Sequence, residues 1–498
     1  MASNPCEVPF GELTAAGIYL DLAYQSITSP EWQELFKRAD KSNLQKKIEG
    51  LFTGAIVNPS EARPALHTAL RNLNKTPVLV NDEDIMPAIA EVWQRIDNLC
   101  NKWIGVTDLI HIGIGGSDFG PRLAMHALAH SNAKSQRNLM RIHFAANVDS
   151  AELEQILSRA QPNSTKVLIV SKSFTTSETI HNARAILHWF KENNLTNSQI
   201  QNALFAVTAN VDGAKAFGVD EENIYPFWDW VGGRFSVWSA VGLPIALQYG
   251  FDTFKAFLQG ADAMDQHFRN TSFEKNLPVL MALAMVHQQE KHQGKAFAII
   301  PYAHSLELLP FWLQQLEMES HGKSIGLNGK AGLGSSPIVF GSAGSNAQHS
   351  FFQLLHQGPD VIPVDFVAVI SAMSSLPQAE TQHRVLLANC LAQAQALALG
   401  KNTDDPNQTY LGQRPSNLIL LKQLDAFHLG ALLSLYEHRA VCLGHLWNLN
   451  SFDQPGVELG KVLARPIEAA LNETDKASDT SSFDTITAAR IDFLKKPK

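Results

Sequence analysis

The sequence predicts an α/β protein with two doubly wound domains, each built on a mostly parallel sheet. The chain has 498 residues, of which 45% are hydrophobic, and single hydrophobic cores stop growing at about 250–300 residues. From residue 107, short apolar runs alternate with helix-like segments, which is typical of parallel strands with helices on both faces. After a helical stretch at 251–293, the same alternation begins again.

The strands of the two rounds can be identified as short apolar runs. The first round contains DLIHIGIG, RIHFAAN, KVLIV and NALFAVTAN, and the second contains KAFAIIPYA, SPIVFGSAG and DVIPVDFVAVI. Helix-like segments follow most of them. We therefore place the first α/β domain at 101–250 and the second at 251–470.

The two ends of the chain differ from these domains. Residues 1–100 have apolar positions at helical spacing in LQKKIEGLFTG, ARPALHTALRNL and IMPAIAEVWQRIDNLCNKW, so we expect a helical region that packs on the second domain. Beyond residue 472 the sequence is polar and then ends in a short amphipathic piece. Residues 471–498 are expected to form an arm that packs on a neighbouring subunit, with a frayed tail as the alternative.

Charge and cysteine content argue against several classes of function. Forty basic and 48 acidic residues give a net charge of −8 without a dense basic block, so nucleic acid and anionic membranes are not expected partners. The four cysteines form no CxxC pair, which argues against a disulfide framework or a zinc site. The N-terminal residues do not have the pattern of a signal peptide, and LPVLMALAMV is about half a membrane span. A soluble cytoplasmic protein is expected.

A hydroxyl-rich loop follows the strand KVLIV. Its sequence, SKSFTTSET at 171–179, has six hydroxyl side chains and one lysine. Ligands of open parallel sheets bind beyond the carboxyl ends of the strands, and Thr175-x-x-Glu178 can form a capping box that begins the next helix. Hydroxyls and free helical N–H groups together suit a phosphate. One or two hydroxyls would fit a simple capped turn, whereas six favour an anion site.

A glycine-rich loop, HIGIGGSDFGP at 111–121, ends the first strand of the same domain. It is not a dinucleotide fingerprint, because Asp118 occupies the position of the third glycine. Gly115, Gly116 and Ser117 would instead allow the backbone to approach a ligand closely. A tight turn without a ligand is the alternative.

Six segments, in the same order along the chain, resemble the signatures of the glucose-6-phosphate isomerase family. Besides these two loops, they are FWDWVGGRFSVWSAVGLP, LQQLEMESHGKS, GSNAQHSFFQLLHQG and SFDQPGVELGK. The resemblance implies the sugar-isomerase (SIS) fold with three αβα layers. It also implies an aldose–ketose isomerase that interconverts D-glucose 6-phosphate and D-fructose 6-phosphate through a cis-enediolate, in glycolysis and gluconeogenesis, without a metal or an organic cofactor.

This reaction needs a base that moves a proton between C2 and C1, an acid/base pair that opens the sugar ring, and positive charge near the enediolate. By resemblance, Glu319 is the base and Arg234 stabilises the enediolate with its permanent charge. From the residues alone, Glu319 could equally face solvent and Arg234 could form a structural salt bridge. Gln315 precedes Glu319 by four residues, so both side chains would project from one helical face.

The resemblance gives the ring-opening role to His349 and Lys461. It also implies that His349 reaches the site across a dimer interface, so that a homodimer is obligatory for activity. Gln454, Glu458 and Lys461 are spaced four and three residues apart and would share one face if this segment is helical. The alternatives are a structural role for His349 and an ordinary surface pair of Glu458 and Lys461.

The resemblance also assigns contacts to the substrate and its phosphate. These residues are Gly116, Ser117, Ser171, Lys172, Ser173, Thr176, Thr179, Gly233, Gln315 and Gln454. The backbone N–H of Lys172 is expected to contribute, while the direction of its ammonium stays open. The sequence departs from the family pattern at Ser173, which keeps a hydroxyl, and at His321 and Pro455, which affect local packing and fine positioning.

Three other functions are alternatives to the isomerisation of glucose 6-phosphate. A metal-dependent aldose isomerase would need divalent ions held by carboxylates and histidines, but the eighteen histidines and the acids form no ligand cluster in the sequence. A non-catalytic sugar-phosphate sensor would need the phosphate loop but not the four catalytic candidates. The third alternative is an isomerase of amino-sugar or mannose phosphates. The motif GGRFSVWSAVGLP and the chain length favour glucose 6-phosphate as the substrate instead.

Overall fold

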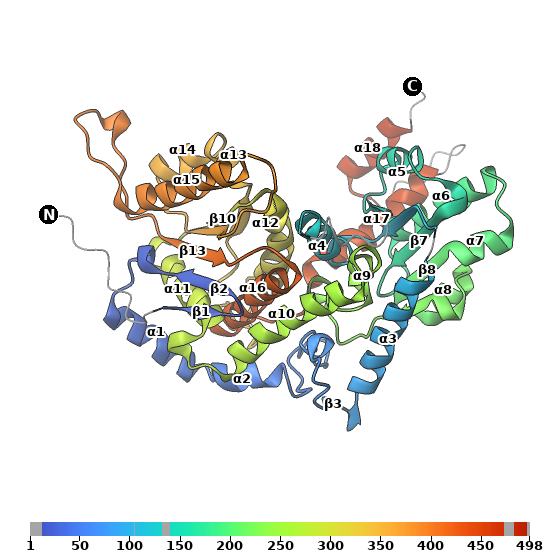
Figure 1. The fold of residues 1–498 in the computed structure, drawn as a ribbon, viewed down its shortest axis with the longest axis horizontal. Helices are drawn as coiled ribbons and strands as arrows, with labels where there is room; N and C mark the ends of the chain where they lie inside the picture. The colour runs from blue at the N-terminus through green and yellow to red at the C-terminus, as the bar shows by residue number, and fades with distance from the viewer. Residues whose placement is uncertain (1–11, 104, 132–139, 473–482, 496–498) are drawn as a thin grey trace. The chain divides into compact units, whose positions relative to one another are not determined.

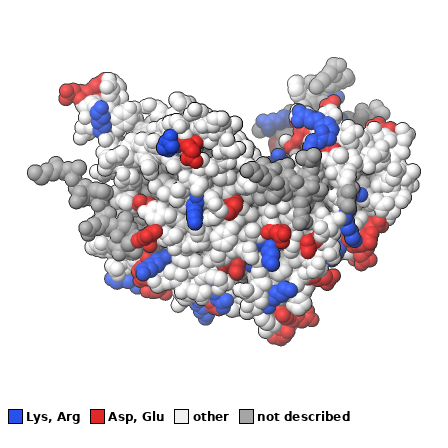
Figure 2. Space-filling view, in the orientation of Figure 1, with Lys and Arg blue, Asp and Glu red and all other residues white. Residues whose placement is uncertain are grey.

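The computed structural model describes residues 12–103, 105–131, 140–472 and 483–495. It divides into two compact units, Met1–Phe452 and Asp453–Lys498. The larger unit contains both predicted sheets, which lie in different parts of it (Figure 1). Acidic and basic side chains are both scattered over the face shown in Figure 2. No helix in the described ranges combines the length and the apolar character that a membrane span requires.

The first sheet has five parallel strands in the order β6-β5-β7-β8-β9. Its strands are β5 (Asp108–Ile112), β6 (Arg141–Ala145), β7 (Thr165–Val170), β8 (Leu204–Thr208) and β9 (Ile224–Pro226). The helices between them are α4 (Phe119–Leu128), α5 (Ser150–Leu157), α6 (Ser177–Glu192), α7 (Asn197–Ala203) and α8 (Val211–Phe217). All four predicted strands are confirmed, and β9 is an addition at the edge.

Both faces of this sheet are covered. Along β5, Leu109 packs into the large central core, while Ile110 and Ile112 pack into a second cluster formed with the helices α5 to α8. Successive side chains of a strand point to opposite faces, so a strand buried on both faces is apolar throughout. This explains why DLIHI and TKVLIV are nearly continuous apolar runs.

The second sheet has six strands in the order β1-β2-β13-β12-β10-β11. They are β1 (Thr14–Ala15), β2 (Ile18–Asp21), β10 (Ala296–Tyr302), β11 (Ile338–Gly341), β12 (Val364–Val369) and β13 (Ser416–Leu421). The four strands β10 to β13 are parallel, and β2 pairs with β13 in the antiparallel direction. Helices α13 (Gly344–Gln348), α14 (Phe352–Gln357) and α15 (Ala379–Leu399) cover one face, which completes three αβα layers (Figure 1).

The N-terminal region is less helical than predicted. It forms α1 (Ser29–Lys41), α2 (Leu44–Gly50) and α3 (Met86–Lys102), but β1 and β2 extend the second sheet. ARPALHTALRNL contains only a 3-10 turn, Ala69–Arg71. Its polar groups bind distant segments instead, since the Thr68 hydroxyl donates to Leu51 O at 2.7 Å and Leu66 N donates to Trp230 O. The domain boundaries 1–100, 101–250, 251–470 and 471–498 stay a prediction.

Two long helices, α10 (Phe251–Asn270) and α16 (Ala426–Trp447), lie against each other in the core (Figure 1). Nearly every residue of α16 is buried, as expected for a helix that is apolar on all sides. The two backbones meet at glycines. A Cβ atom on Gly260 would lie 1.7 Å from Phe427 O, and one on Gly430 would lie 2.0 Å from Phe257 O.

Three consecutive ionisable residues, Glu437, His438 and Arg439, lie in the middle of α16 and are buried. The guanidinium of Arg71 donates to Glu437 at 2.6 Å and to Asp265, on α10, at 2.7 Å. His438 Nε2 lies 2.6 Å from the same Asp265 carboxylate. The residues thus connect α16 with α10 and the N-terminal region.

The third of these residues, Arg439, pairs with two further carboxylates. It donates to Glu317 at 2.9 Å and to Asp365, on β12, at 3.0 Å. Tyr436 also donates to Asp365, at 3.0 Å. The nearby positive charge of Arg439 and the neighbouring imidazole of His321 lower the pKa of Glu317 despite its burial. Every one of these buried charges therefore has an opposite charge beside it, as burial requires.

The described residues of the smaller unit include the helices α17 (Glu458–Asn472) and α18 (Thr485–Leu494). Asp484 caps α18, because its side chain accepts from the N–H groups of Ile486 and Thr487. Of the predicted arm at 471–498, residues 473–482 and 496–498 lie outside the described residues.

The contact between α10 and α16 predicts that Gly260→Ala lowers the thermal denaturation midpoint. The added methyl group would overlap a backbone carbonyl, and overpacking of this kind costs about 1–3 kcal/mol. Gly430→Ala should have a similar effect. Gly460→Ala is the control, because a Cβ atom there meets nothing within 4 Å. An unchanged midpoint in both core variants would contradict the close contact of these helices.

Candidate active site

The hydroxyl loop connects β7 to α6, as predicted, but the helix begins later than the capping box requires. Thr176 is the N-cap of α6, and its side chain makes no capping hydrogen bond. The Thr175 hydroxyl donates to Ser173 Oγ at 2.8 Å instead. Phe174 turns the chain here with a φ of 54° and buries its ring. The predicted capping box is therefore wrong, and the first N–H groups of α6 are not capped by Thr176 and can face an anion.

The candidate phosphate contacts surround this helix start. Ser171 is buried, and its hydroxyl shares a hydrogen bond of 3.1 Å with that of Thr176. Ser173 is exposed, and Thr179 is buried on the first turn of α6. The hydroxyls thus range from the interior to the surface around one helix N-terminus, where the helix dipole favours negative charge.

The Lys172 ammonium points away from the hydroxyls of its own loop. It donates to the carbonyls of Asp229 and Val231 at 2.6 and 2.9 Å. Burial, together with the positive charge of Arg63, lowers the pKa of Lys172 to about 8. The side chain therefore ties the hydroxyl loop to the segment that leads into Gly233 and Arg234.

The glycine loop lies directly against that same segment. A Cβ atom on Gly116 would lie 2.1 Å from both the carbonyl carbon and the oxygen of Gly233, so only glycine allows this contact. The Ser236 hydroxyl donates to Gly116 O at 3.3 Å. Ser117 O accepts from His111 Nε2 at 2.7 Å, and burial keeps that imidazole neutral by lowering its pKa to about 4.

Arg234 is buried beside the candidate base. Its Nε donates to Ser320 Oγ at 2.7 Å, and one Nη donates to Ser451 O at 2.6 Å. The other Nη lies 3.6 Å from the Glu319 carboxylate, whose side chain is 21% exposed. The acceptors Ser320 and Ser451 help to hold the guanidinium, which faces a carboxylate that is partly open to solvent.

Glu319 ends a π-helical turn, Gln315–Glu319, that follows α12 (Leu309–Gln314). The α-helical geometry that the sequence suggested for this pair is therefore wrong. The Gln315 amide nitrogen lies 3.1 Å from the position of a Cβ on Gly115. Its buried Oε1 has no hydrogen-bond partner among the described residues. Single π turns are frequent at functional sites, and an unpaired buried oxygen suits a ligand hydroxyl.

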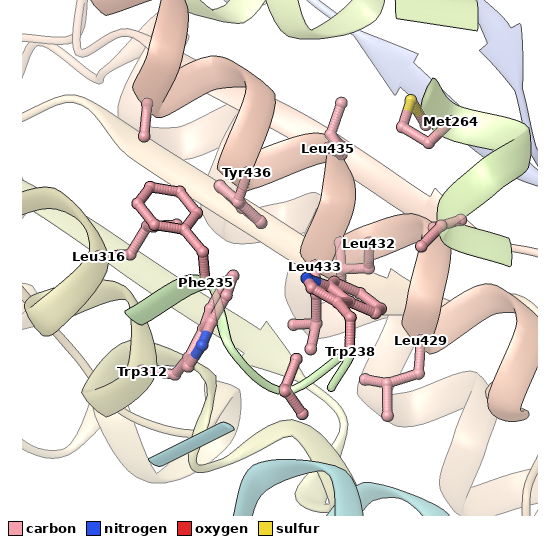
Figure 3. Close-up of a cluster of buried hydrophobic side chains, with 14 of the residues drawn as sticks. Phe235, Trp238, Met264, Trp312, Leu316, Leu429, Leu432, Leu433, Leu435 and Tyr436 are labelled. Carbon is pink, nitrogen blue, oxygen red and sulfur yellow. The ribbon is translucent and has the colours of Figure 1, made fainter. Parts of the chain in front are cut away.

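The segment that carries Arg234 and the segment that carries Glu319 contribute to one hydrophobic cluster (Figure 3). Its side chains come from the segment around Arg234, from the segment that ends in the π turn, and from α16. They include Phe235, Trp238, Trp312, Leu316, Leu432 and Leu433. Packing in a protein interior is close to that of a crystal, so this cluster fixes the distance between the arginine and the base.

Three residues that support the arginine were not predicted as site residues. Ser320 and Ser451 accept its hydrogen bonds, and His321 Nε2 lies 3.0 Å from Ser451 Oγ. His321 is also 3.6 Å from Glu317 and packs edge-on against Trp447. The departure noted at position 321 is thus part of the packing behind the site. Membership of the matched segments was the only sequence signal for these residues.

Three further candidates are His349 in the larger unit and Gln454 and Lys461 in the smaller unit. His349 follows α13 and is exposed, and its backbone N–H donates to Asn346 O. In the smaller unit, exposed Lys461 pairs with Glu458 at 2.8 Å, which is the surface pair named as the alternative. Gln454 precedes a 3-10 turn over Pro455–Val457, so it does not share a helical face with Lys461, and that expectation is wrong because the helix begins only at Glu458.

A comparison with known families matches residues 21–491 to the model described as phosphoglucose isomerase. The chain belongs to the phosphoglucose isomerase family. The predicted family, fold and enzyme class are confirmed.

Similar proteins agree with this family. The chain is 43% identical to a glucose-6-phosphate isomerase of Cupriavidus metallidurans, over 96% of the chain and 91% of the relative. It is 38% identical to one of Hahella chejuensis, over 99% and 92%. Among solved structures, a glucose-6-phosphate isomerase of Chlamydia trachomatis superposes with a TM-score of 0.86 at 33% identity, over 93% of this chain and 90% of that one.

The position of the Lys172 ammonium predicts a role in holding two loops of the isomerase together. Lys172→Met should raise KM for fructose 6-phosphate about tenfold, equivalent to about 1.4 kcal/mol, with a smaller effect on kcat. Since the pKa is about 8, the ammonium is charged below pH 8 and loses its charge above it. The KM of the unaltered enzyme should therefore rise above pH 8, and that of the variant should not.

Lys166→Met is the matched control for this prediction. Lys166 lies at the other end of the same strand region and also donates its ammonium to a backbone carbonyl, that of Asn202, at 2.6 Å. It should change KM less than about twofold, as expected for surface substitutions. Equal effects of the two variants would show that Lys172 has no special role.

Proposed function

We propose that the chain interconverts D-glucose 6-phosphate and D-fructose 6-phosphate through a cis-enediolate, with Glu319 as the base. Membership of the phosphoglucose isomerase family supports the reaction. The observation that carries the residue assignment is the pairing of the accessible Glu319 carboxylate with the buried Arg234 guanidinium at 3.6 Å. The glycolytic and gluconeogenic role and a cytoplasmic location belong to the same proposal.

The proton transfer needs one carboxylate in two steps. Glu319 takes the proton from C2 of the open-chain aldose, and the negative charge then lies on the oxygens of the enediolate. The proton on O2 is transferred to O1, and the same carboxyl group then returns its own proton to C1, which forms the ketose with its carbonyl at C2. Arg234 stabilises the charged intermediate, and its hydrogen bonds to Ser320 and Ser451 orient it before the charge develops, as electrostatic catalysis requires.

The phosphate is assigned to the hydroxyl loop. Ser171, Ser173, Thr176 and Thr179 would donate to its oxygens together with the N–H groups at the start of α6. Gly116 and Ser117 form the adjacent wall, next to Gly233. The unpaired Gln315 Oε1 would accept from a sugar hydroxyl between the phosphate and the base.

Ring opening is assigned to His349 and Lys461, with Gln454 as a further substrate contact. His349 is exposed in its own chain, which suits a side chain that completes the site of a second subunit. We therefore propose a homodimer with shared active sites. Neither residue takes part in the proton transfer between C2 and C1.

The proposal predicts that Glu319→Gln lowers kcat for fructose 6-phosphate by about 10²–10⁴-fold or more, because an amide cannot accept the proton. Substrate binding, measured by calorimetry on the variant, should stay within about threefold of the KM of the unaltered enzyme. Glu34→Gln, at an exposed carboxylate, is the control and should keep full activity. Turnover of Glu319→Gln near that of the unaltered enzyme would refute the base assignment, and an inactive unaltered protein that binds the substrate would favour a sensor.

The shared site predicts complementation between two inactive chains. Homodimers of Glu319→Gln and of His349→Ala should each have little activity. Co-expressed heterodimers should regain activity, because one of their two sites contains both an intact base and an intact histidine. The measurement is specific activity of heterodimers purified through two different affinity tags, and no regain in confirmed heterodimers would contradict the shared site.

A further inference from the structure

A second cluster of polar side chains lies outside the isomerisation site. His126 is on α4, and His304 and Glu307 are in the turn that precedes α12. We propose that these three residues bind a divalent transition-metal ion of the zinc class. This inference does not depend on the catalytic roles assigned above.

The distances between the three side chains fit one ion. His126 Nε2 lies 3.3 Å from one Glu307 oxygen, and His304 Nδ1 lies 3.2 Å from the other. One ligand atom from each residue lies within 4.8 Å of the others. Zinc bonds of about 2.0–2.2 Å place two ligands of a tetrahedral ion about 3.4 Å apart. Small rotations of exposed side chains are enough to reach that geometry.

The chemistry of the donors selects the class of ion. Two imidazoles and one carboxylate suit Zn²⁺, Co²⁺ or Ni²⁺, whereas Mg²⁺ and Ca²⁺ prefer oxygen ligands alone. His126 Nε2 lies 3.2 Å from the His304 carbonyl oxygen, in a hydrogen bond that a metal ion would replace. Water would complete the coordination, because the His304 side chain is 71% exposed.

The ordinary alternative is a surface cluster of hydrogen bonds. Two observations favour a metal over it. The nearest cation on the same helix, Arg122, is bound by Asp118 at 2.9 Å and leaves Glu307 to the imidazoles. His126 also lines a cavity of about 420 Å³ together with Met125 and Leu308, so an ion and its waters can reach the imidazole from that side.

The position of the cluster gives the ion a structural effect. His126 is on the helix that follows the glycine loop, and Glu307 precedes the helix that continues into the π turn with Glu319. A bound ion would link these two segments and limit their relative motion. It would raise the thermal stability of the enzyme without taking part in proton transfer.

The test is metal binding by the untagged full-length protein. The protein is first treated with EDTA to remove bound metal, and the EDTA is then removed. Zn²⁺ is titrated against a chromophoric chelator, and Co²⁺ is followed by its visible d–d absorption. One high-affinity equivalent per chain is expected, with a rise in the denaturation midpoint. His304→Gln should weaken Zn²⁺ binding at least about 100-fold, as the loss of one of three protein ligands implies.

A matched control separates this site from ordinary surface histidines. His188 lies 3.1 Å from Glu192 on the exposed face of α6, and His188→Gln should leave the high-affinity equivalent unchanged. The proposal would be overturned if the unaltered protein does not bind Zn²⁺, or if His304→Gln does not weaken binding. Equal losses of Zn²⁺ binding in His304→Gln and His188→Gln would also overturn it. Isomerase activity of the EDTA-treated protein is recorded alongside, so a failed metal site and a failed catalytic assignment give different results.

Discussion

The positions of the proposed catalytic groups depend on the buried charges of α16. Arg439 pairs with Asp365 on the second sheet and with Glu317 in the middle of the π turn, so it fixes the turn that presents Glu319. Its neighbour Glu437 pairs with Arg71 from the N-terminal region. Removing one partner of such a pair leaves a buried charge alone, which costs about 3–5 kcal/mol. The same helix therefore specifies which way the base points and holds the N-terminal region in place.

The strands and the loops of this protein could be read from the sequence because their signals are local. Strands buried on both faces are apolar throughout, and six hydroxyls in nine residues are conspicuous in any context. β9 and β13 were not among the predicted strands, although SNLILL is an apolar run that precedes the long helix α16. The pairing of Arg234 with Glu319 joins positions 85 residues apart and became visible only in three dimensions.

Local signals failed where distant contacts compete with them. The spacing of Thr175 and Glu178 suits a capping box, but Phe174 buries its ring and shifts the start of the helix. The sequence around Glu319 has regular helical spacing and did not indicate a π turn, in the middle of which Glu317 pairs with the distant Arg439. His126 and His304 are far apart in the sequence and show no ligand spacing there, yet they lie beside the same carboxylate.

The contact between Gly116 and Gly233 sets a length inside the enzyme. If Gly116 and Ser117 form one wall of the phosphate site as proposed, the distance from that wall to the segment that carries Arg234 is set by one backbone resting on another, and a change of rotamer cannot alter it. A sugar phosphate with one carbon fewer or one more would hold its reacting carbons away from Glu319 even if its hydroxyls were bound. Under this proposal, the contact between the two glycines makes the chain length of the substrate the property that is hardest to change by substituting side chains.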